Sequence, residues 1–280
     1  MNWREVWERK HRERVGVGVE REPGPEYWDK VAEDFSQWNK LANYQYGRKA
    51  VEAIRKIINP DFEALDIGAG PGTLAIPFAQ VVQKVTTIEP SPVMLRYLLK
   101  NAEEEGIQNI EVINKSWQEV NDPDIRKKFD IVVCSHLLWQ FEDVDWQLRR
   151  MEDASRGYCC VVHPAGGADI TVKALWSEVT GKPYADELDP DLDDLVFVIL
   201  RQRGILVNVK VIDYTVKRTR EQEVRLIARL LDKHVELTPT LKMIVEKSVL
   251  ERSPNGVYEA KNNAVVMWWK VPPKRLTKEV

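Results

Sequence analysis

The feature that most constrains the fold is the stretch Glu63–Gln80, which reads EALDIGAGPGTLAIPFAQ. A short apolar run leads there into glycines at alternating positions, Gly68, Gly70 and Gly72, and a helix-like segment follows. Because glycine lacks a Cβ, it lets the backbone turn with positive φ and pass close to a ligand. The stretch therefore predicts a strand, a tight turn and a helix whose N-terminal N–H groups face a ligand.

Strand-like and helix-like segments alternate on both sides of this turn. The helix pattern is clearest in SPVMLRYLLKNAEEEG, where Ser91 suits the N-cap, Pro92 the first helical position and Gly106 the C-terminal stop. Such an alternation predicts a doubly wound, mostly parallel sheet of an α/β protein. The five strands expected in it are 64–67, 84–89, 110–114, 130–134 and 158–163.

The last third of the chain has a different pattern. Residues 205–216, ILVNVKVIDYTV, alternate with period two, and a further strand-like run, NAVVMWWK, comes near the end. We expect these two strands to form a hairpin at the sheet edge, which brings the sheet to about seven strands. Two amphipathic helices lie between them. The expected organisation is an aromatic-rich helical cap over residues 1–48 and one α/β domain over 49–280. Insertions near 168–204 and 219–255 would serve the acceptor side of that domain.

Composition excludes several classes of function. The formal charge of −3 argues against a protein whose main partner is a nucleic acid. No apolar run is long enough to span a membrane, and the charged N-terminus does not resemble a secretory signal. We therefore expect a soluble cytoplasmic protein without a membrane partner.

Neither the cysteines nor the acidic residues predict a metal site. Cys134, Cys159 and Cys160 lie in expected buried strands, without metal-ligand spacing. The acidic run Ala185–Asp194 is more typical of a solvated loop than of a metal site. We expect no metal.

The residues around the glycines indicate which ligand they hold. A dinucleotide fingerprint needs glycine at position 73, where this chain has Thr73, and a phosphate-binding loop of the Walker type needs a lysine that is absent here. Asp66 would repel a pyrophosphate but attract an ammonium group. Glu89, at the end of the second strand, can accept hydrogen bonds from both hydroxyls of a ribose. A ligand with an amino group, a ribose and no phosphate is indicated.

With LDIGAGPG followed by VTTIEPSPVML, the chain resembles the class I S-adenosylmethionine-dependent methyltransferases. The resemblance covers roughly Trp28 to Gly167 and implies a Rossmann-like fold with S-adenosylmethionine as cofactor. In this family the glycine turn holds the methionine part, the acid of strand two the ribose, and Met94 packs on the adenine. The cofactor-binding residues implied are Asp66, Gly68, Ala69, Gly70, Gly72, Glu89, Pro90, Met94, Ser116, Trp117 and Ser135.

One position departs from the family pattern. The loop after the third strand normally carries an acid or amide that contacts the adenine amino group, and this chain has Ser116 there. The neighbouring Trp117, or its backbone N–H, can compensate.

His136 follows the fourth strand, at a position that faces the donor methyl group in this fold. It can orient or deprotonate an acceptor, or it can be a packed histidine beneath the cofactor. Further candidates on the substrate side are Trp28, Trp38, Tyr46 and Trp139. The N-terminal tryptophans can form an aromatic cage, but side chains of this kind more often attach a helix to its domain.

The predicted function is methyl transfer from S-adenosylmethionine to a small-molecule acceptor by in-line displacement. Two alternatives remain: a protein side chain as acceptor, or a scaffold that binds the cofactor without catalysis. A nicotinamide-dependent dehydrogenase is disfavoured by Thr73. The motifs that mark methylation of nucleic-acid bases are absent, so we expect no nucleic-acid partner.

Overall fold

The central element of the fold is a seven-stranded sheet with the strand order β3-β2-β1-β4-β5-β7-β6. The computed structural model describes residues 2–16, 24–165, 175–176, 178–179, 181, 192–232 and 235–272. Strands β1 to β5 run parallel, whereas β7 runs antiparallel to both β5 and β6. The strands are β1 (Glu63–Ile67), β2 (Lys84–Ile88), β3 (Ile110–Ile113), β4 (Phe129–Ser135), β5 (Ser155–Ala165), β6 (Asn208–Thr219) and β7 (Val257–Lys270).

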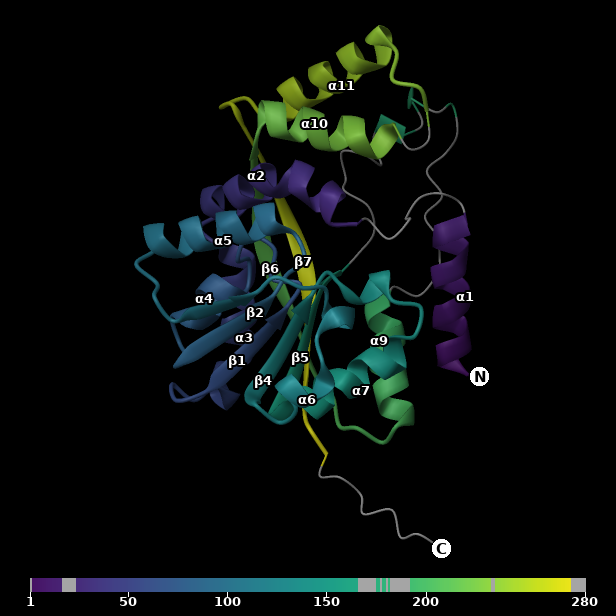
Figure 1. The fold of residues 1–280 in the computed structure, drawn as a ribbon. Helices are drawn as coiled ribbons and strands as arrows, with labels where there is room; N and C mark the ends of the chain where they lie inside the picture. Colours follow the sequence, from purple (N-terminus) through teal and green to yellow (C-terminus); the bar gives the residue numbers. More distant parts are fainter. Residues whose placement is uncertain are drawn as a thin grey trace, which may run out of the picture.

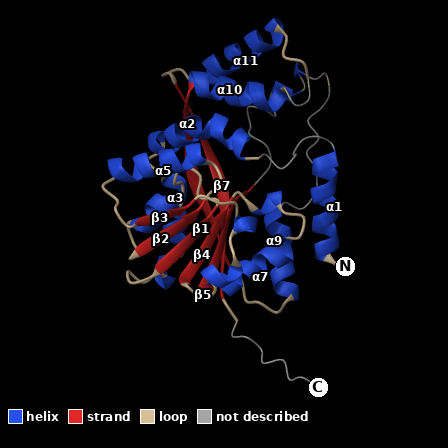
Figure 2. Ribbon diagram, in the orientation of Figure 1, coloured by secondary structure: helices blue, strands red, loops and turns tan. Residues whose placement is uncertain are grey.

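Helices cover both faces of this sheet, as Figures 1 and 2 show. They are α1 (Trp3–Gly16), α2 (Pro25–Leu41), α3 (Gln45–Ala53), α4 (Ala75–Ala79), α5 (Pro92–Glu104), α6 (Asp122–Ile125), α7 (Val144–Ala154), α9 (Leu192–Gln202), α10 (Arg220–Leu231) and α11 (Pro239–Arg252). Short 3₁₀ segments occupy η1 (Arg55–Ile57), η2 (Trp117–Glu119) and η3 (Leu138–Gln140). None of the described helices is long and apolar enough to cross a membrane.

Successive side chains of each strand point to opposite faces of the sheet, and this divides the apolar core into two halves. In β4, Val132 packs into the half formed with α7 and α9, and Val133 packs into the half formed with α3, α4 and α5. Successive strand side chains point to opposite faces, so a strand buried on both sides must be apolar at nearly every position. The apolar runs in the sequence are therefore explained by helices on both faces, and the doubly wound fold is confirmed.

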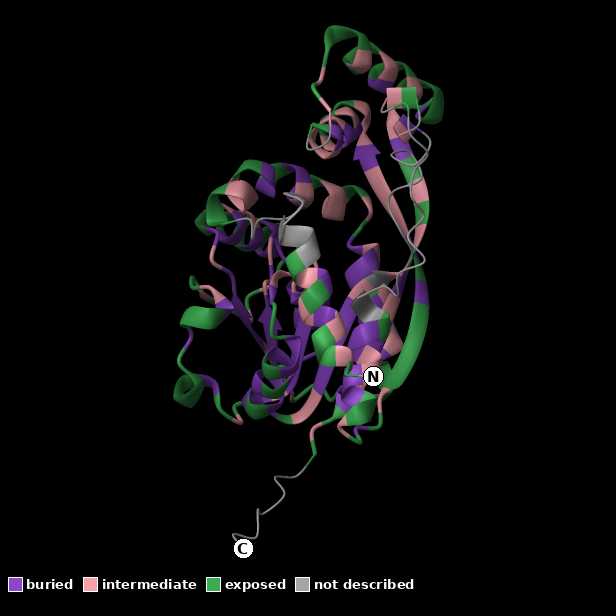
Figure 3. Ribbon diagram, turned by 90° about the vertical axis from the view of Figure 1, so that its right-hand side faces the viewer, coloured by how far each residue is buried: buried purple, intermediate pink, exposed green. Residues whose placement is uncertain are grey.

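The late strands form the predicted hairpin, which extends beyond the rest of the sheet. Pairing of β7 with β5 ends at Ala165–Asn263, but its pairing with β6 continues to Thr219–Val257. Helices α10 and α11 lie at the protruding end, above α2 (Figure 1). They share a small apolar cluster of their own, and most of the outer surface of α11 is exposed (Figure 3).

The N-terminal segment divides between two sides of the molecule. Helix α1 packs against α7 and α9, while α2 packs against α5 and β6. Trp7 is buried and donates a hydrogen bond from Nε1 to the carbonyl oxygen of Phe141 at 2.7 Å. This tryptophan therefore attaches α1 to the domain. The predicted boundary after residue 48 falls inside α3. Residues 185–191 of the acidic run 185–194, and most of residues 168–191 of the predicted insertion 168–204, lie outside the described residues.

Candidate functional site

The glycine turn joins β1 to α4 at the carboxyl end of the sheet. All three glycines have positive φ, with 71° at Gly68, 53° at Gly70 and 97° at Gly72. A Cβ added at Gly72 would lie 2.8 Å from Cδ1 of Ile76, whereas one added at Gly70 would meet no atom within 4 Å. Gly72 is thus required by helix packing, and Gly70 faces open space that a ligand can fill.

Asp66 is the second-last residue of β1, just before this turn. Its side chain is buried, and its Oδ2 has no hydrogen-bond partner. Burial and, to a lesser degree, the nearby Glu89 together raise the pKa of Asp66 to about 7, against the opposing effect of the N–H of Ala75. A buried carboxylate oxygen without a partner is costly, and a cationic ligand group would relieve that cost.

Glu89 follows β2, and its carboxylate accepts hydrogen bonds from two backbone N–H groups. Its Oε2 accepts a hydrogen bond from the N–H of Gly70 at 2.9 Å, and its Oε1 accepts one from the N–H of Ser91 at 2.9 Å. Burial raises the pKa of Glu89, while these two N–H groups lower it. Each carboxylate oxygen can accept more than one hydrogen bond, so both retain acceptor capacity for ribose hydroxyls.

Helix α2 lies against the segment that follows Glu89. The hydroxyl of Ser91 donates to Oδ1 of Asp29 at 2.5 Å and accepts from the N–H of Met94 at 2.9 Å. Met94 is buried in an apolar cluster with residues of α2, and Trp28 packs against that cluster. Pro90, which is half-buried, uses its carbonyl oxygen to accept from Nδ2 of Asn114 at 2.9 Å. The proximity of Asp29 was not predicted, because no local pattern connects residues 62 positions apart.

The two residues predicted to contact the adenine, Ser116 and Trp117, form different hydrogen bonds within the protein. Ser116 donates from both its N–H and its hydroxyl to Oε2 of Glu119, each at 2.8 Å. Trp117 is buried, and its Nε1 donates to Oε1 of Gln147 at 2.9 Å. The indole N–H of Trp117 is therefore engaged within the protein, which leaves the backbone of this loop for an adenine contact.

The loop after β4 lies directly against the glycine turn. A Cβ at Gly68 would lie 3.0 Å from Cδ2 of Leu137. The next residue of the turn, Ala69, is buried, and its backbone nitrogen lies 3.3 Å from the carbonyl oxygen of Ile88. His136, one residue before Leu137, has an exposed side chain and a φ of 53°. A bulky residue in the left-handed region is uncommon and costly, and such positions occur often at functional sites.

The candidates on the substrate side lie at different depths. Tyr46 is buried, and its hydroxyl lies 2.8 Å from Oγ of Ser135. Trp139 donates from Nε1 to the carbonyl oxygen of His136 at 2.7 Å. Trp38 lies farther along α2 beneath the guanidinium of Arg218, 4.8 Å from the ring centroid, and its buried Nε1 has no partner.

Sequence reasoning missed one histidine near this loop. The ring of His163, in β5, stacks on that of His136 with 5.9 Å between centroids and 23° between planes. The detectable signal was its position as the last residue of the fifth predicted strand. Residues that end neighbouring parallel strands meet at one edge of a sheet.

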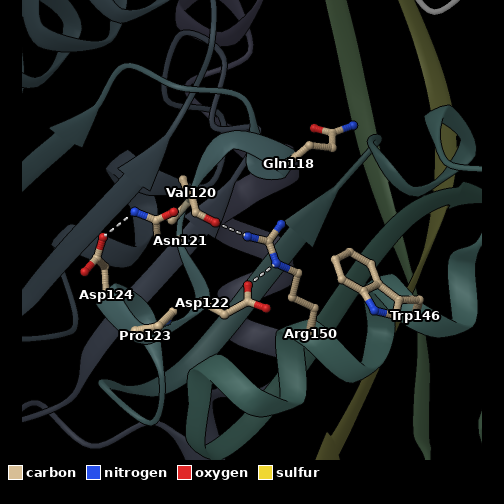
Figure 4. A pocket seen from close by; sticks show the side chains of 8 residues that line it. All are labelled: Gln118, Val120, Asn121, Asp122, Pro123, Asp124, Trp146 and Arg150. Carbon is tan, nitrogen blue, oxygen red and sulfur yellow. Dashed lines mark hydrogen bonds and ion pairs between the residues drawn. The ribbon is translucent and has the colours of Figure 1, made fainter.

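A separate hollow lies on the flank formed by η2, α6 and α7 (Figure 4). The guanidinium of Arg150 occupies its wall, stacks 4.0 Å from the ring centroid of Trp117 and donates to Oδ1 of Asp122 at 2.5 Å. It also donates to the carbonyl oxygens of Trp117 and Val120. These groups bind one another, and no residue of the glycine turn takes part.

The described residues include no group of three or more His, Cys, Asp or Glu side chains placed to hold a metal ion. The three cysteines are buried in strands β4 and β5, and burial raises the pKa of each thiol above its ordinary value.

Comparison with known proteins shows that the segment around this site is similar to a known family. Residues 64–156 match the family described as Methyltransferase domain. The first two curated relatives, from Methanocaldococcus jannaschii and Haemophilus influenzae, are each 31% identical over 103 and 111 residues. The aligned part covers 36% and 40% of this chain and 39% and 40% of theirs, so the chain spans less than half of their length. A protein of Methanosphaera stadtmanae, named as a probable ribosomal RNA small subunit methyltransferase A, is 36% identical over 101 residues, 35% of each chain.

Solved structures extend the likeness to most of the fold. The YcgJ protein of Bacillus subtilis has a TM-score of 0.51 at 17% identity, over 80% of this chain and 98% of that one. The magnesium protoporphyrin IX methyltransferase of Synechocystis PCC 6803 has a TM-score of 0.50 at 11% identity, over 83% and 85%. At these identities the likeness concerns the fold alone.

The fold and the matched segment together define the class. Residues 64–156 match the Methyltransferase domain family, and the chain shares the Rossmann-like fold of the solved structure of YcgJ. The residues present fit the methyl donor, because Asp66 offers an unpartnered carboxylate oxygen, Gly70 faces open space and Glu89 retains acceptor capacity.

Proposed function

We propose that the protein transfers a methyl group from S-adenosylmethionine to a small-molecule acceptor. The observation that carries the donor assignment is the buried Oδ2 of Asp66, which has no partner and lies beneath a glycine turn open at Gly70. When bound, S-adenosylmethionine supplies an electrophilic methyl group on a sulfonium. The chain's own residues hold the donor, orient the acceptor and exclude water.

Asp66, Gly70 and Glu89 would hold the donor. Asp66 would pair with its ammonium group, the backbone at Gly70 would lie along the methionine part, and Glu89 would accept from the ribose. His136, on the loop that contacts the glycine turn, would face the acceptor. The roles of Ser116 and Trp117 at the adenine, and of Trp28, Trp38, Tyr46 and Trp139 at the acceptor, stay predictions.

Two observations support a small acceptor. The formal charge of −3 offers no general attraction to nucleic acid. Helix α10 is also attached to α2, because Arg225 forms an ion pair with Asp34 and Gln222 forms a hydrogen bond with Gln37. An insertion held against α2 in this way favours a small acceptor over a macromolecule. The relative named for ribosomal RNA methylation makes RNA the alternative that an experiment must exclude.

Calorimetry with S-adenosylhomocysteine and with NAD tests the donor assignment. We expect S-adenosylhomocysteine alone to bind, and Glu89→Gln to weaken that binding by about 1–3 kcal/mol, the cost of hydrogen bonds to a charged acceptor. Glu111→Gln is the matched control, because Glu111 is an exposed carboxylate on the neighbouring strand β3. Binding of NAD without S-adenosylhomocysteine would refute the proposal.

Transfer of radiolabelled methyl groups to fractions of a cell lysate tests the acceptor class. We expect the label in the low-molecular-mass fraction. Label in the RNA or protein fraction would show that the acceptor is a macromolecule, while leaving the donor assignment in place.

A further inference from the structure

Two imidazoles and two hydroxyls meet where β4 and β5 end. The rings of His136 and His163 stack with 5.9 Å between centroids. The ring of Tyr46 lies 5.4 Å from that of His136 and 4.9 Å from that of Tyr214, and its hydroxyl bonds Ser135. Tyr46 and Tyr214 are buried while His136 is exposed, so the imidazoles form the accessible surface of an aromatic floor.

The backbone holds His136 at this place despite its unfavourable conformation. Its N–H lies 3.3 Å from the carbonyl oxygen of Val162, and its own carbonyl oxygen accepts from Nε1 of Trp139. Leu137, the next residue, contacts Gly68 of the cofactor turn. A φ of 53° at a histidine is therefore maintained by contacts on both sides, directly beside the donor site.

The imidazole of His136 is a weak base. Protein packed around part of the ring lowers its pKa below the ordinary value, although the residue stays accessible to solvent, and the neighbouring His163 lowers the pKa further. The titratable groups that face it are the phenol of Tyr46 from α3 and the imidazole of His163 from β5. Among the described residues no carboxylate contributes to this pKa. His136 is therefore neutral at pH 7 and can accept a proton or a hydrogen bond.

The acidity of the acceptor hydroxyl limits what an imidazole can deprotonate. Water and simple alcohols lose a proton only near pH 16, whereas a phenol does so near pH 10, so among hydroxyl groups a phenol is the one from which an imidazole most readily takes a proton. A neutral amine needs no base. An anionic carboxylate would require a cation, and the guanidinium of Arg218 is paired with Glu223. The aromatic side chains of the floor also favour a flat ring.

We propose that His136 and His163 form the hydrogen-bond-accepting wall of the acceptor site, and that the acceptor is a small molecule methylated at an aromatic hydroxyl. The proposal rests on the proposed function above. The acceptor O–H bond breaks and its proton passes to the imidazole of His136. The oxygen forms a bond to the methyl carbon, and the bond from that carbon to sulfur breaks with its electron pair remaining on sulfur. His136 is the catalytic residue and His163 positions its ring.

The ring signals of the histidines in NMR spectra test this without knowledge of the natural acceptor. In the complex with S-adenosylhomocysteine, we expect added phenol to shift the signals of His136 and His163, assigned from His136→Gln and His163→Gln. Benzylamine and cyclohexanol, which lack an aromatic hydroxyl, should not. His11, on helix α1, is the internal control, because its Nε2 lies 3.3 Å from the carbonyl oxygen of Gln140 and it takes no part in the pair of stacked imidazoles. We also expect phenol to bind at least tenfold more weakly to His136→Gln.

The role of His163 is tested separately by a pH titration. His163→Phe keeps a flat ring but removes the second imidazole, so the His136 signal should titrate at higher pH than in the wild type. An unchanged titration would refute the positioning role.

The outcomes separate the two proposals. If S-adenosylhomocysteine does not bind, the proposed function fails. If it binds but phenol leaves both signals unmoved, or binds His136→Gln as well as wild type, only the present inference is overturned.

Discussion

The replacement Gly70→Ala tests whether the open space at the glycine turn belongs to the methyl donor. Gly70 has a φ of 53°, and a Cβ added there meets no atom within 4 Å. The substitution therefore adds no clash, and its cost to folding is the left-handed backbone alone, about 1–2 kcal/mol. For a protein of this size, each kcal/mol lowers Tm by about 2–4 °C.

Gly106→Ala provides a matched control. Gly106, after the end of α5, has a φ of 68° and likewise has no atom within 4 Å of an added Cβ. Both variants should lose the same stability. Only at Gly70 would the new methyl group occupy space needed by the ligand, so only that variant should lose affinity for S-adenosylhomocysteine. We expect a rise in Kd of tenfold or more, at least about 1.4 kcal/mol.

Thermal denaturation and isothermal titration calorimetry measure the two quantities separately. Equal Kd values for Gly70→Ala and Gly106→Ala would show that the space above Gly70 is not the ligand site. A loss of stability at Gly70 far above that at Gly106 would show that the turn is packed from above.

Three other changes have defined outcomes. The pKa of Asp66 is about 7 in the free protein, and an ammonium group favours its ionised form. S-adenosylhomocysteine should therefore bind more weakly below pH 7, by up to about tenfold per pH unit. Calorimetry should show that Asp66→Asn abolishes this pH dependence, and a pH dependence that persists in the variant would assign the titration to another group. In denaturant unfolding, His136→Gly should be more stable than His136→Ala by about 1 kcal/mol, because glycine accepts positive φ; equal stabilities would mean that this backbone is unstrained. Thr219 pairs with Val257, so an Asn-Gly turn can replace residues 220–256. The affinity of this variant for S-adenosylhomocysteine should stay within about threefold of the wild-type value, while methyl transfer is lost. If the variant keeps a native circular dichroism spectrum but no longer binds S-adenosylhomocysteine, the insertion serves the donor.

Local patterns in the sequence were sufficient to predict the elements that form the proposed donor site. Ser91 caps α5 through the N–H of Met94, Pro92 begins that helix, and Gly106 follows its end with positive φ, as expected. The glycine turn lies between β1 and α4 for the same reason. Caps and turns depend on hydrogen bonds and φ values within a few residues, so the order of residues determines them.

The acceptor side was decided by contacts between distant segments. His136 and His163 meet because Ser135 pairs with Val162 across β4 and β5, and Tyr214 joins them because β6 returns along the sheet edge. No spacing in the chain encodes these distances. The sequence determined an α/β sheet with a glycine turn at its carboxyl edge, where we propose that the donor binds. Only the tertiary structure decided which side chains surround the proposed acceptor site, because the pairing of β4, β5, β7 and β6 and the packing of α3 bring them together.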